Sequence, residues 1–368
     1  MAARATSGHI RDEWPTYGGD LDPATWARIR AAIRHEEGDR VPIWDYIDNR
    51  PVVDHFRRSG ETYGETMVRV YHSLGIDLCR GYGSSFGDED EGRTNDEHTT
   101  KVSGKTSWSL RKAITSYEEL ARYEPHLVTE EDCENWVKGT LATQARLAPY
   151  SYGVPGCGCG FHEVYDLMGQ QFFSYAIYDA RKDLDRLFEF YRHNSTMIAR
   201  AAAKLKAGPI FFTWADIAYK GRLLYSLQFL RETFIPMLRA VCEPLNDAGL
   251  TVIFHSDGDV TTIVDDMLDA GISGLNPIEP QAGMDIGAMK RRYGDRLILV
   301  GNVDCSQVLP LGSVEDVIEA TKACLRAAGH GGGLFIGSSS EIVPATPLRN
   351  VLAFFEACRT YGRYPLQV

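Results

Sequence analysis

The sequence lacks the features of a membrane-spanning or nucleic-acid-binding protein. No run of apolar residues approaches the roughly 18 residues that a helix needs to cross a bilayer. Positive charge is also scarce: 39 lysines and arginines face 50 aspartates and glutamates, and the formal net charge is −11. A nucleic-acid or anionic membrane surface needs a concentrated positive field. We therefore expect neither nucleic acid nor a membrane among the partners.

The sequence also lacks the features of a secreted, disulfide-rich protein. The N-terminal segment MAARATSGHIRDEWPTYGGD has no apolar core of the kind found in a signal peptide. The 8 cysteines are scattered irregularly, which is typical of reduced thiols and not of a disulfide framework. We therefore expect a cytoplasmic protein.

What the sequence does contain is enough apolar material for a large core. Hydrophobic residues make up 44% of the 368, a length that suits one α/β barrel with an N-terminal elaboration. Residues 1–25 are polar and hold several prolines and glycines, so we expect a loose arm there. Residues 26–368 are expected to form the barrel domain, and a helical pattern that runs from Pro23 to His35 crosses the boundary.

The second half alternates short apolar runs with helical patterns. The runs are Ile210–Trp214, Thr251–His255, Gly271–Asn276, Leu297–Gly301 and Gly333–Gly337. The helical patterns are Leu227–Ala248, Val260–Ala270, Asp285–Tyr293, Ser313–Ala328 and Pro347–Tyr361. This alternation predicts βα units and a parallel sheet. No G-x-G-x-x-G follows a run, which favours a (β/α)8 TIM barrel over a doubly wound sheet.

Three segments of the first half have less regular patterns. The charge-rich stretch 84–107 predicts a solvated hairpin or loop, with a lid as the alternative. The segment GVPGCGCGF, which contains Cys157 and Cys159, is interpreted as a glycine-rich loop with incidental thiols, because no second pair completes a zinc site. The aromatic residues around Phe172–Tyr178 and Phe188–Tyr191 have helical spacing and are expected in the core.

Polar side chains follow each apolar run of the second half. Active sites of (β/α)8 barrels lie at the carboxyl ends of the strands, so these side chains should converge on one rim. They are Asp216, Tyr219, His255, Asp257, Asn276, Glu279, Asn302, Asp304, Cys305 and Glu341. This convergence is the main functional signal that the residues themselves provide.

For several rim residues a purely structural role is the alternative to a functional one. His255 and Asp257 lie two positions apart, so two ligand-capable side chains share one face of a strand. Asp216 could instead cap the following helix. Glu279 lies between two prolines in a stiff loop and has no evident helical role. Asn302, Asp304 and Glu341 are either functional or turn and surface groups, and Cys305 is a further candidate ligand on the rim.

The motifs resemble those of the uroporphyrinogen decarboxylase-like superfamily. The resemblance rests on TWADIAYKGRLLYS, VIFHSDGDV, GISGLNPIEPQAGMD, KRRYGDRLILVGNVD, GGGLFIGSSSEIVPATPLRNV and, near the N-terminus, DRVPIWDY and LGIDLCR. It covers about Pro209 to Tyr361 and most of the chain overall, and it implies a (β/α)8 barrel. Two chemistries are known in this superfamily, decarboxylation of an acidic tetrapyrrole and methyl transfer to a corrinoid.

Both branches have a pattern from which this chain departs. Where the decarboxylases resemble R-Q-A-G-R, the segment Ile43–Arg50 has one arginine and two aspartates, and a polycarboxylate ligand needs cations. The methyltransferases bind zinc through His-x-Cys and a late cysteine. Here His255 keeps the histidine, Asp257 replaces the first cysteine, and Ser340 with Glu341 replaces the second. Zinc also accepts carboxylate oxygens.

The resemblance therefore implies a methyltransferase that moves a methyl group from a small O- or N-methylated compound to a corrinoid protein. A divalent metal, with zinc as the candidate, would be bound by His255, Asp257, Glu341 and Cys305. The catalytic set is expected to be Asp216, His255 and Glu279, with Asp216 and Glu279 orienting the substrate or protonating the leaving group.

The remaining expectations concern substrate binding, assembly and rival functions. Substrate-binding residues are expected to be Tyr219, Asn276, Asn302 and Asp304, and a homodimer is the default assembly. One rival is a metal-free carboxy-lyase in which Asp77 or Asp216 stabilises a cationic intermediate. The other is a subunit that has lost catalysis.

Overall fold

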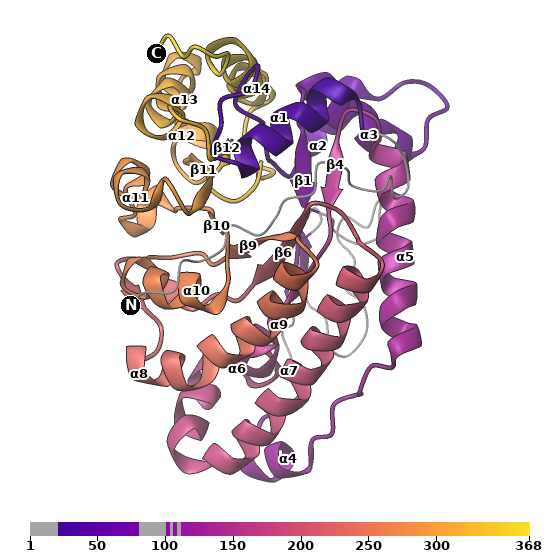
Figure 1. Ribbon diagram of the computed structural model, residues 1–368, viewed down its shortest axis with the longest axis vertical. Coiled ribbons are helices and arrows are strands. Elements are labelled where there is room, and N and C mark those ends of the chain that lie inside the picture. The colour runs from indigo at the N-terminus through magenta and orange to yellow at the C-terminus, as the bar shows by residue number, and fades with distance from the viewer. Residues whose placement is uncertain (1–20, 81–100, 104–105, 109–111) are drawn as a thin grey trace.

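The computed structural model describes residues 21–80, 101–103, 106–108 and 112–368. Short parallel strands form the centre, and helices surround them (Figure 1). The parallel strands at the centre are β1 (Leu78–Arg80), β4 (Tyr152–Val154), β5 (Gly156–Gly158), β6 (Ile210–Trp214), β9 (Thr251–His255), β10 (Gly274–Asn276), β11 (Ile298–Val303) and β12 (Leu334–Ser338). Two antiparallel hairpins lie outside it: β2 (Lys101–Ser103) with β3 (Thr106–Trp108), and β7 (Ala218–Tyr219) with β8 (Arg222–Leu223).

Parallel pairings link the central segments in a ring. Six strands pair in the order β12-β11-β10-β9-β6-β5, and β4 pairs with β1. Pro155 separates β4 from β5, so this segment contacts β1 on one side and β6 on the other. Single bridges from Ile43 to Ile336 of β12 and from Trp44 to Leu78 of β1 join the two ends. The expected α/β architecture with a parallel sheet is confirmed, and its strand pairings follow the order of a (β/α)8 barrel.

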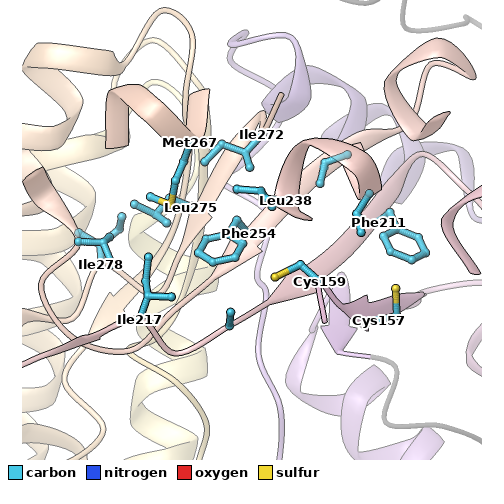
Figure 2. Packing of buried hydrophobic residues seen from close by; sticks show 14 of the residues in the cluster. Cys157, Cys159, Phe211, Ile217, Leu238, Phe254, Met267, Ile272, Leu275 and Ile278 are labelled. Carbon is cyan, nitrogen blue, oxygen red and sulfur yellow. The ribbon is translucent and has the colours of Figure 1, made fainter. Parts of the chain in front are cut away.

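The strands have two apolar faces because alternate side chains point to opposite sides. One buried cluster fills the barrel interior with inward-pointing side chains, among them Trp44, Phe212, Ile253, Val300 and Phe335. A larger cluster lies between the strands and the helices, and Figure 2 shows part of it, including Phe211, Leu238, Phe254, Met267 and Leu275. Because the longer strands β6 and β9 are buried on both faces, their sequences are nearly continuous apolar runs.

The helices cover the outside of the ring. They are α1 (Pro23–Ile33), α2 (Arg50–Phe56), α3 (Tyr63–Leu74), α4 (Tyr117–Arg122), α5 (Glu130–Leu147), α6 (Phe161–Asp179), α7 (Arg181–Lys204), α8 (Leu227–Phe229), α9 (Ile235–Asp247), α10 (Val264–Ala270), α11 (Ile286–Tyr293), α12 (Val308–Leu311), α13 (Val314–Ala328) and α14 (Leu348–Tyr361). A π-helical turn at Leu230–Phe234 joins α8 to α9, so the pattern predicted at Leu227–Ala248 is one nearly continuous helical segment. The C-terminal helix α14 packs against the N-terminal helices α2 and α3, so the two ends of the described chain lie side by side (Figure 1).

Helix starts follow local capping chemistry. Ser313 and Asp316 exchange side-chain and backbone hydrogen bonds at the start of α13, as do Thr62 and Glu65 at α3. Such reciprocal caps satisfy backbone N–H groups that have no partner within the helix. The helix predicted to begin at Ser313 therefore begins one residue later, with Ser313 as its cap.

Several expectations for the first half need correction. Cys157 lies within β5, so GVPGCGCGF is partly strand and not simply a loop. On α6, Phe173 is buried, but Tyr175 and Tyr178 are exposed because they lie on the helix face away from the core. The expected arm falls mainly on residues outside the described part of the chain, and α1 already begins at Pro23.

The stretch 84–107 also lies largely outside the described residues. Its end forms the hairpin of β2 and β3. The boundary at residue 25 between arm and barrel domain remains a prediction. Among the described helices, none combines the length and apolar character needed to span a bilayer.

Candidate functional site at the carboxyl ends of the strands

The register of three neighbouring strands aligns three polar or aromatic side chains. Trp214 of β6 pairs with His255 of β9, and His255 pairs with Asn276 of β10. All three end their strands on the inner face, where Phe212 contacts the His255 ring with 5.7 Å between centroids. Asp216 and Asp257 follow two of these strands directly. Parallel strands end at one rim of the barrel, so the residues meet there.

Asp216, His255 and Asp257 form one cluster. Their ligand-type atoms all lie within 4.8 Å of one another. His255 Nε2 lies 3.9 Å from Asp216 Oδ1 and 3.7 Å from Asp257 Oδ1. The backbone N–H of Asp257 donates to Asp216 Oδ1 at 3.1 Å, which holds the two loops together. One imidazole nitrogen and two carboxylates are a donor set that suits a divalent cation.

Asn276 fixes the orientation of the His255 ring. His255 Nδ1 and Asn276 Oδ1 are 2.7 Å apart, and the Asn276 amide nitrogen donates to the Val300 carbonyl at 3.5 Å. Since the amide oxygen can only accept, Nδ1 carries the proton. In the neutral form of the ring the lone pair is then on Nε2, the nitrogen that faces the two carboxylates. This arrangement is how proteins orient a metal-ligating histidine.

Helix α6 supplies two further residues, which sequence reasoning missed. The backbone N–H of Asp216 donates to His162 Nδ1 at 3.3 Å, and the Tyr165 hydroxyl donates to the Asp216 carbonyl at 3.0 Å. His162 Nδ1 also lies 3.6 Å from Asp216 Oδ2. His162 is separated from Asp216 by more than fifty residues and follows no long apolar run, so the sequence offered no direct signal for it.

Asp257 and Glu279 make the rim acidic. Burial raises the pKa of Asp257; His255 opposes the increase, and the charges of Asp216 and Glu279 add to it. Glu279 Oε2 accepts a hydrogen bond from the backbone N–H of Gly258 at 2.8 Å. The expected rim position of Glu279 is therefore observed, and its carboxylate holds the loop that follows Asp257.

Glu341 and Cys305 do not join the cluster. Arg80 donates from Nη2 to Glu341 Oε2 at 3.0 Å and to the Ser340 carbonyl at 3.2 Å. Ser339 Oγ donates to Cys305 Sγ at 3.4 Å, and burial raises the pKa of that thiol. Of the four residues expected to bind a metal, the structure brings only His255 and Asp257 together, and Asp216 takes the third position.

The residues expected to bind substrate have mixed surroundings. Gln281 and the backbone N–H groups of the 306–307 turn all donate to Asp304. Burial acts to raise the pKa of Asp304, but these hydrogen bonds outweigh it, and the pKa is lowered. Asn302 donates to the Ile278 carbonyl at 3.0 Å. Tyr219 is 58% exposed in the β7–β8 hairpin, while Asn276 holds His255. Asp304 and Asn302 therefore have structural partners.

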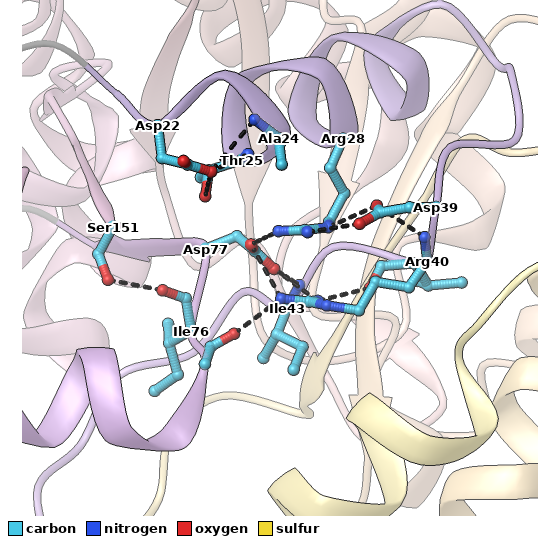
Figure 3. A network of polar contacts seen from close by, with 12 residues as sticks. Asp22, Ala24, Thr25, Arg28, Asp39, Arg40, Ile43, Ile76, Asp77 and Ser151 are labelled. Carbon is cyan, nitrogen blue, oxygen red and sulfur yellow. Dashed lines mark hydrogen bonds and ion pairs between the residues drawn. The ribbon is translucent and has the colours of Figure 1, made fainter. Parts of the chain in front are cut away.

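Asp77 lies at the opposite end of the barrel, before β1. Arg28 and Arg40 contact its carboxylate at 2.5 and 2.7 Å, and the Ile43 backbone N–H donates to it at 2.7 Å (Figure 3). Because the side chain is 2% exposed and fully occupied, the rival role for Asp77 as a catalytic carboxylate is not supported.

Together these features define an α/β-barrel protein with a candidate metal-binding cluster at the carboxyl rim. The uroporphyrinogen decarboxylase (URO-D) family matches residues 107–361, more than half of the chain. The chain belongs to this family.

Similarity to curated relatives covers both chemistries of the family. The chain is 30% identical over 165 residues to "Methylcobamide:CoM methyltransferase MtaA" of Methanosarcina barkeri, covering 45% of each chain. It is 29% identical over 169 residues to uroporphyrinogen decarboxylase of Coxiella burnetii, covering 45% of this chain and 44% of that one. The matched segment thus spans less than half the length of these relatives.

A solved methyltransferase from Methanosarcina mazei has the same fold. Its TM-score is 0.66 at 20% identity, with 90% of this chain and 97% of that chain covered. At this identity the similarity supports the architecture and not the reaction.

Proposed function

We propose that this protein transfers a methyl group from a small O- or N-methylated compound to a corrinoid protein, assisted by a divalent metal. The observation that carries the proposal is the cluster of Asp216, His255 and Asp257, in which His255 Nε2 faces two carboxylates. The name of the M. barkeri relative includes both methylcobamide and a methyl-transfer activity, which supports the same reaction class.

The donor set fits zinc or a similar divalent ion. Asp216, His255 and Asp257 would bind it, and Asn276 would keep the imidazole in the ligating tautomer. A bound metal would act as a Lewis acid on the heteroatom that carries the methyl group. Glu279 would keep the loop after Asp257 in place through Gly258. Glu341 would limit the positive charge of Arg80 at the rim.

A metal-free carboxy-lyase is the second candidate, because the C. burnetii decarboxylase is almost as similar as the methyltransferase. In this chain the segment Ile43–Arg50 stands where the decarboxylases resemble R-Q-A-G-R, and its contacts give the lyase little support. Asp45 accepts hydrogen bonds from the Ser338 backbone and side chain, and Asn49 caps α2. Arg50 pairs with Asp54 on the surface of the same helix. These residues therefore provide no cationic site for a polycarboxylate.

Metal content and methyl transfer test the proposal together. Elemental analysis of protein purified without chelator is expected to find about one zinc per chain in the wild type and in the control His126→Ala, whose side chain is 81% exposed. His255→Ala should lose the metal. Methyl transfer to free cob(I)alamin is then followed across a panel of methyl donors. If the metal-free protein decarboxylates a tetrapyrrole, the carboxy-lyase is favoured. If the protein forms a stable complex with a partner protein but turns over no methyl donor, the non-catalytic subunit is favoured.

A further inference from the structure

The β7–β8 hairpin follows β6 and so belongs to the carboxyl rim of the barrel. Tyr219 pairs with Arg222 across the hairpin, and Lys220 and Gly221 form the turn between them. Because Ala218 is buried, its neighbour Tyr219 points to the outer face of the ribbon, and the cross-strand partner of Tyr219 shares that face. Tyr219, Lys220 and Arg222 are all exposed. The hairpin therefore presents an aromatic ring and two cations to the solvent.

Contacts with two neighbouring rim loops hold the hairpin in place. The backbone N–H of Asp259 donates to the Tyr219 carbonyl at 3.0 Å, and the backbone N–H of Gly221 donates to the Ala282 carbonyl at 2.9 Å. Gly258 has a φ of 88°, and a Cβ there would lie 2.5 Å from the Tyr219 backbone nitrogen, so glycine is required where the loop after β9 packs against the hairpin. The hairpin is thus fixed relative to the candidate metal cluster.

The two cations of the hairpin are not used by the rest of the described chain. No hydrogen bond or ion pair links the side chain of Lys220 or of Arg222 to another residue in the described ranges. Arg80, which ends β1 at the same rim, instead pairs with Glu341. In a chain with a formal net charge of −11, two such cations beside an acidic rim mark a place where an anion can bind.

We propose that the β7–β8 hairpin binds the nucleotide side chain of a corrinoid, with Lys220 and Arg222 on its phosphodiester and Tyr219 stacked on its base. This inference rests on the function proposed above and narrows the methyl acceptor to a cobamide, the class of corrinoid that carries a nucleotide. A guanidinium binds phosphate oxygens through paired N–H donors, and an aromatic ring stacks on the flat face of a base. The side chains of the hairpin therefore match both parts of a nucleotide.

The position of the hairpin suits an acceptor that must also reach the metal cluster. Tyr219 follows Asp216 by three positions, so their Cα atoms lie at most about 11 Å apart. In a cobamide the nucleotide is attached at the edge of the corrin ring, and the cobalt lies at the centre of the ring. A corrinoid whose nucleotide is bound by the hairpin can therefore place its cobalt over a substrate at the cluster. The rim carboxylates would repel a phosphate, so cations are needed where the nucleotide lies.

Binding of the corrinoid can be measured without a methyl donor. Methylcobalamin carries the nucleotide, and methylcobinamide has the same corrin ring without it. Equilibrium dialysis of the full-length protein at low salt is expected to give a Kd for methylcobalamin that is about 10-fold lower than the Kd for methylcobinamide. Equal affinities for the two corrinoids, or no saturable binding of methylcobalamin, would overturn the proposal.

A pair of double variants assigns the preference to the hairpin. In Lys220→Gln/Arg222→Gln the Kd for methylcobalamin should rise about 10-fold, while the Kd for methylcobinamide should not change. The matched control, Arg146→Gln/Arg200→Gln, removes two exposed cations near the ends of α5 and α7 that precede strands, and it should bind both corrinoids like the wild type. If the hairpin variant lost affinity equally for both corrinoids, or lost no more than the control, the hairpin would not bind the nucleotide.

Methyl transfer distinguishes this inference from the proposed function. With cob(I)alamin as the acceptor, the hairpin variant should raise the KM for the corrinoid and leave kcat unchanged, because the nucleotide is held equally before and during the reaction. Transfer with the same KM for cob(I)alamin and cob(I)inamide would overturn the role of the hairpin and leave the methyltransferase proposal intact. If no methyl donor is turned over but methylcobalamin still binds selectively through the hairpin, the proposed reaction fails and the nucleotide site is supported.

Discussion

The two ends of the barrel use aspartates in opposite ways. At the amino end, Asp77 meets two guanidinium groups and a backbone N–H, so its charge is paired on every side (Figure 3). At the carboxyl end, Asp216 and Asp257 lie near each other and near the His255 imidazole. The first arrangement is complete without a ligand, whereas the second gathers negative charge that a cation would neutralise.

This contrast separates stability from function. A buried carboxylate between arginines is costly to break, because removing one partner leaves charge without compensation. Carboxylates that repel each other cost stability in the metal-free protein and acquire their use when a ligand binds. Each end can therefore be tested by removing one charge and measuring both stability and metal affinity.

The largest expected effect is on stability at the amino end. Asp77→Asn removes the charge shared by Arg28 and Arg40, and we expect the free energy of unfolding to fall by about 3–5 kcal/mol. Urea denaturation followed by circular dichroism measures the loss. Zinc stoichiometry of the folded variant should not change, because the residue lies at the other end of the barrel.

The matched control is a surface pair. Asp54→Asn breaks the contact with Arg50 within α2, where both side chains are at least one-third exposed. Such pairs contribute about 0–1 kcal/mol. If Asp77→Asn were no more destabilising than this control, the amino-end network would not be the stabilising element inferred here.

An intermediate effect is expected from the residue that orients His255. Asn276→Leu removes the acceptor for His255 Nδ1, and zinc affinity should fall by about 10–100-fold as the ring loses its fixed tautomer. Asn276→Asp keeps an acceptor oxygen and should retain most of the affinity. Competition with a chromophoric chelator measures both variants. Equal affinity in the leucine variant and the wild type would mean that His255 does not bind through Nε2.

The fold was largely predictable from the sequence where strands are long. The runs Ile210–Trp214 and Thr251–His255 were predicted at their observed bounds, because strands buried on both faces leave continuous apolar runs. The first half was harder. There β1, β4 and β5 have three residues each, and Pro155 separates β4 from β5. Such short segments carry no periodicity, and their pairing depends on the closure of the ring.

The site was predictable only in part. The rule that strand ends converge found Asp216, His255 and Asp257, but it could not rank them against Glu341, which pairs with Arg80. His162 comes from a helix whose first turn reaches the loop after another strand. No local pattern encodes such a contact, because it arises only from the tertiary packing of α6.

The smallest expected effect has the opposite sign to that of Asp77→Asn. Asp257 has a raised pKa, so its charged form costs stability in the metal-free protein above the folded-state pKa, and this cost disappears as the pH falls through that value. Since the side chain is 51% exposed, solvent screening limits the cost. Asp257→Asn should therefore stabilise the chelator-treated protein by about 0.5–1 kcal/mol at pH 8 and by less at lower pH.

To test whether Asp257→Asn stabilises the metal-free protein, the free energy of unfolding in urea is compared between this variant and the wild type at several pH values. Glu319→Gln, which changes a 64% exposed surface carboxylate, is the matched control and should stay within about 0.5 kcal/mol of the wild type at each pH. With zinc present the order should reverse, because the wild type gains binding free energy that Asp257→Asn has lost. If Asp257→Asn destabilised the metal-free protein as Asp77→Asn does, the carboxyl end would be a second structural network, and the contrast between the two ends would fail.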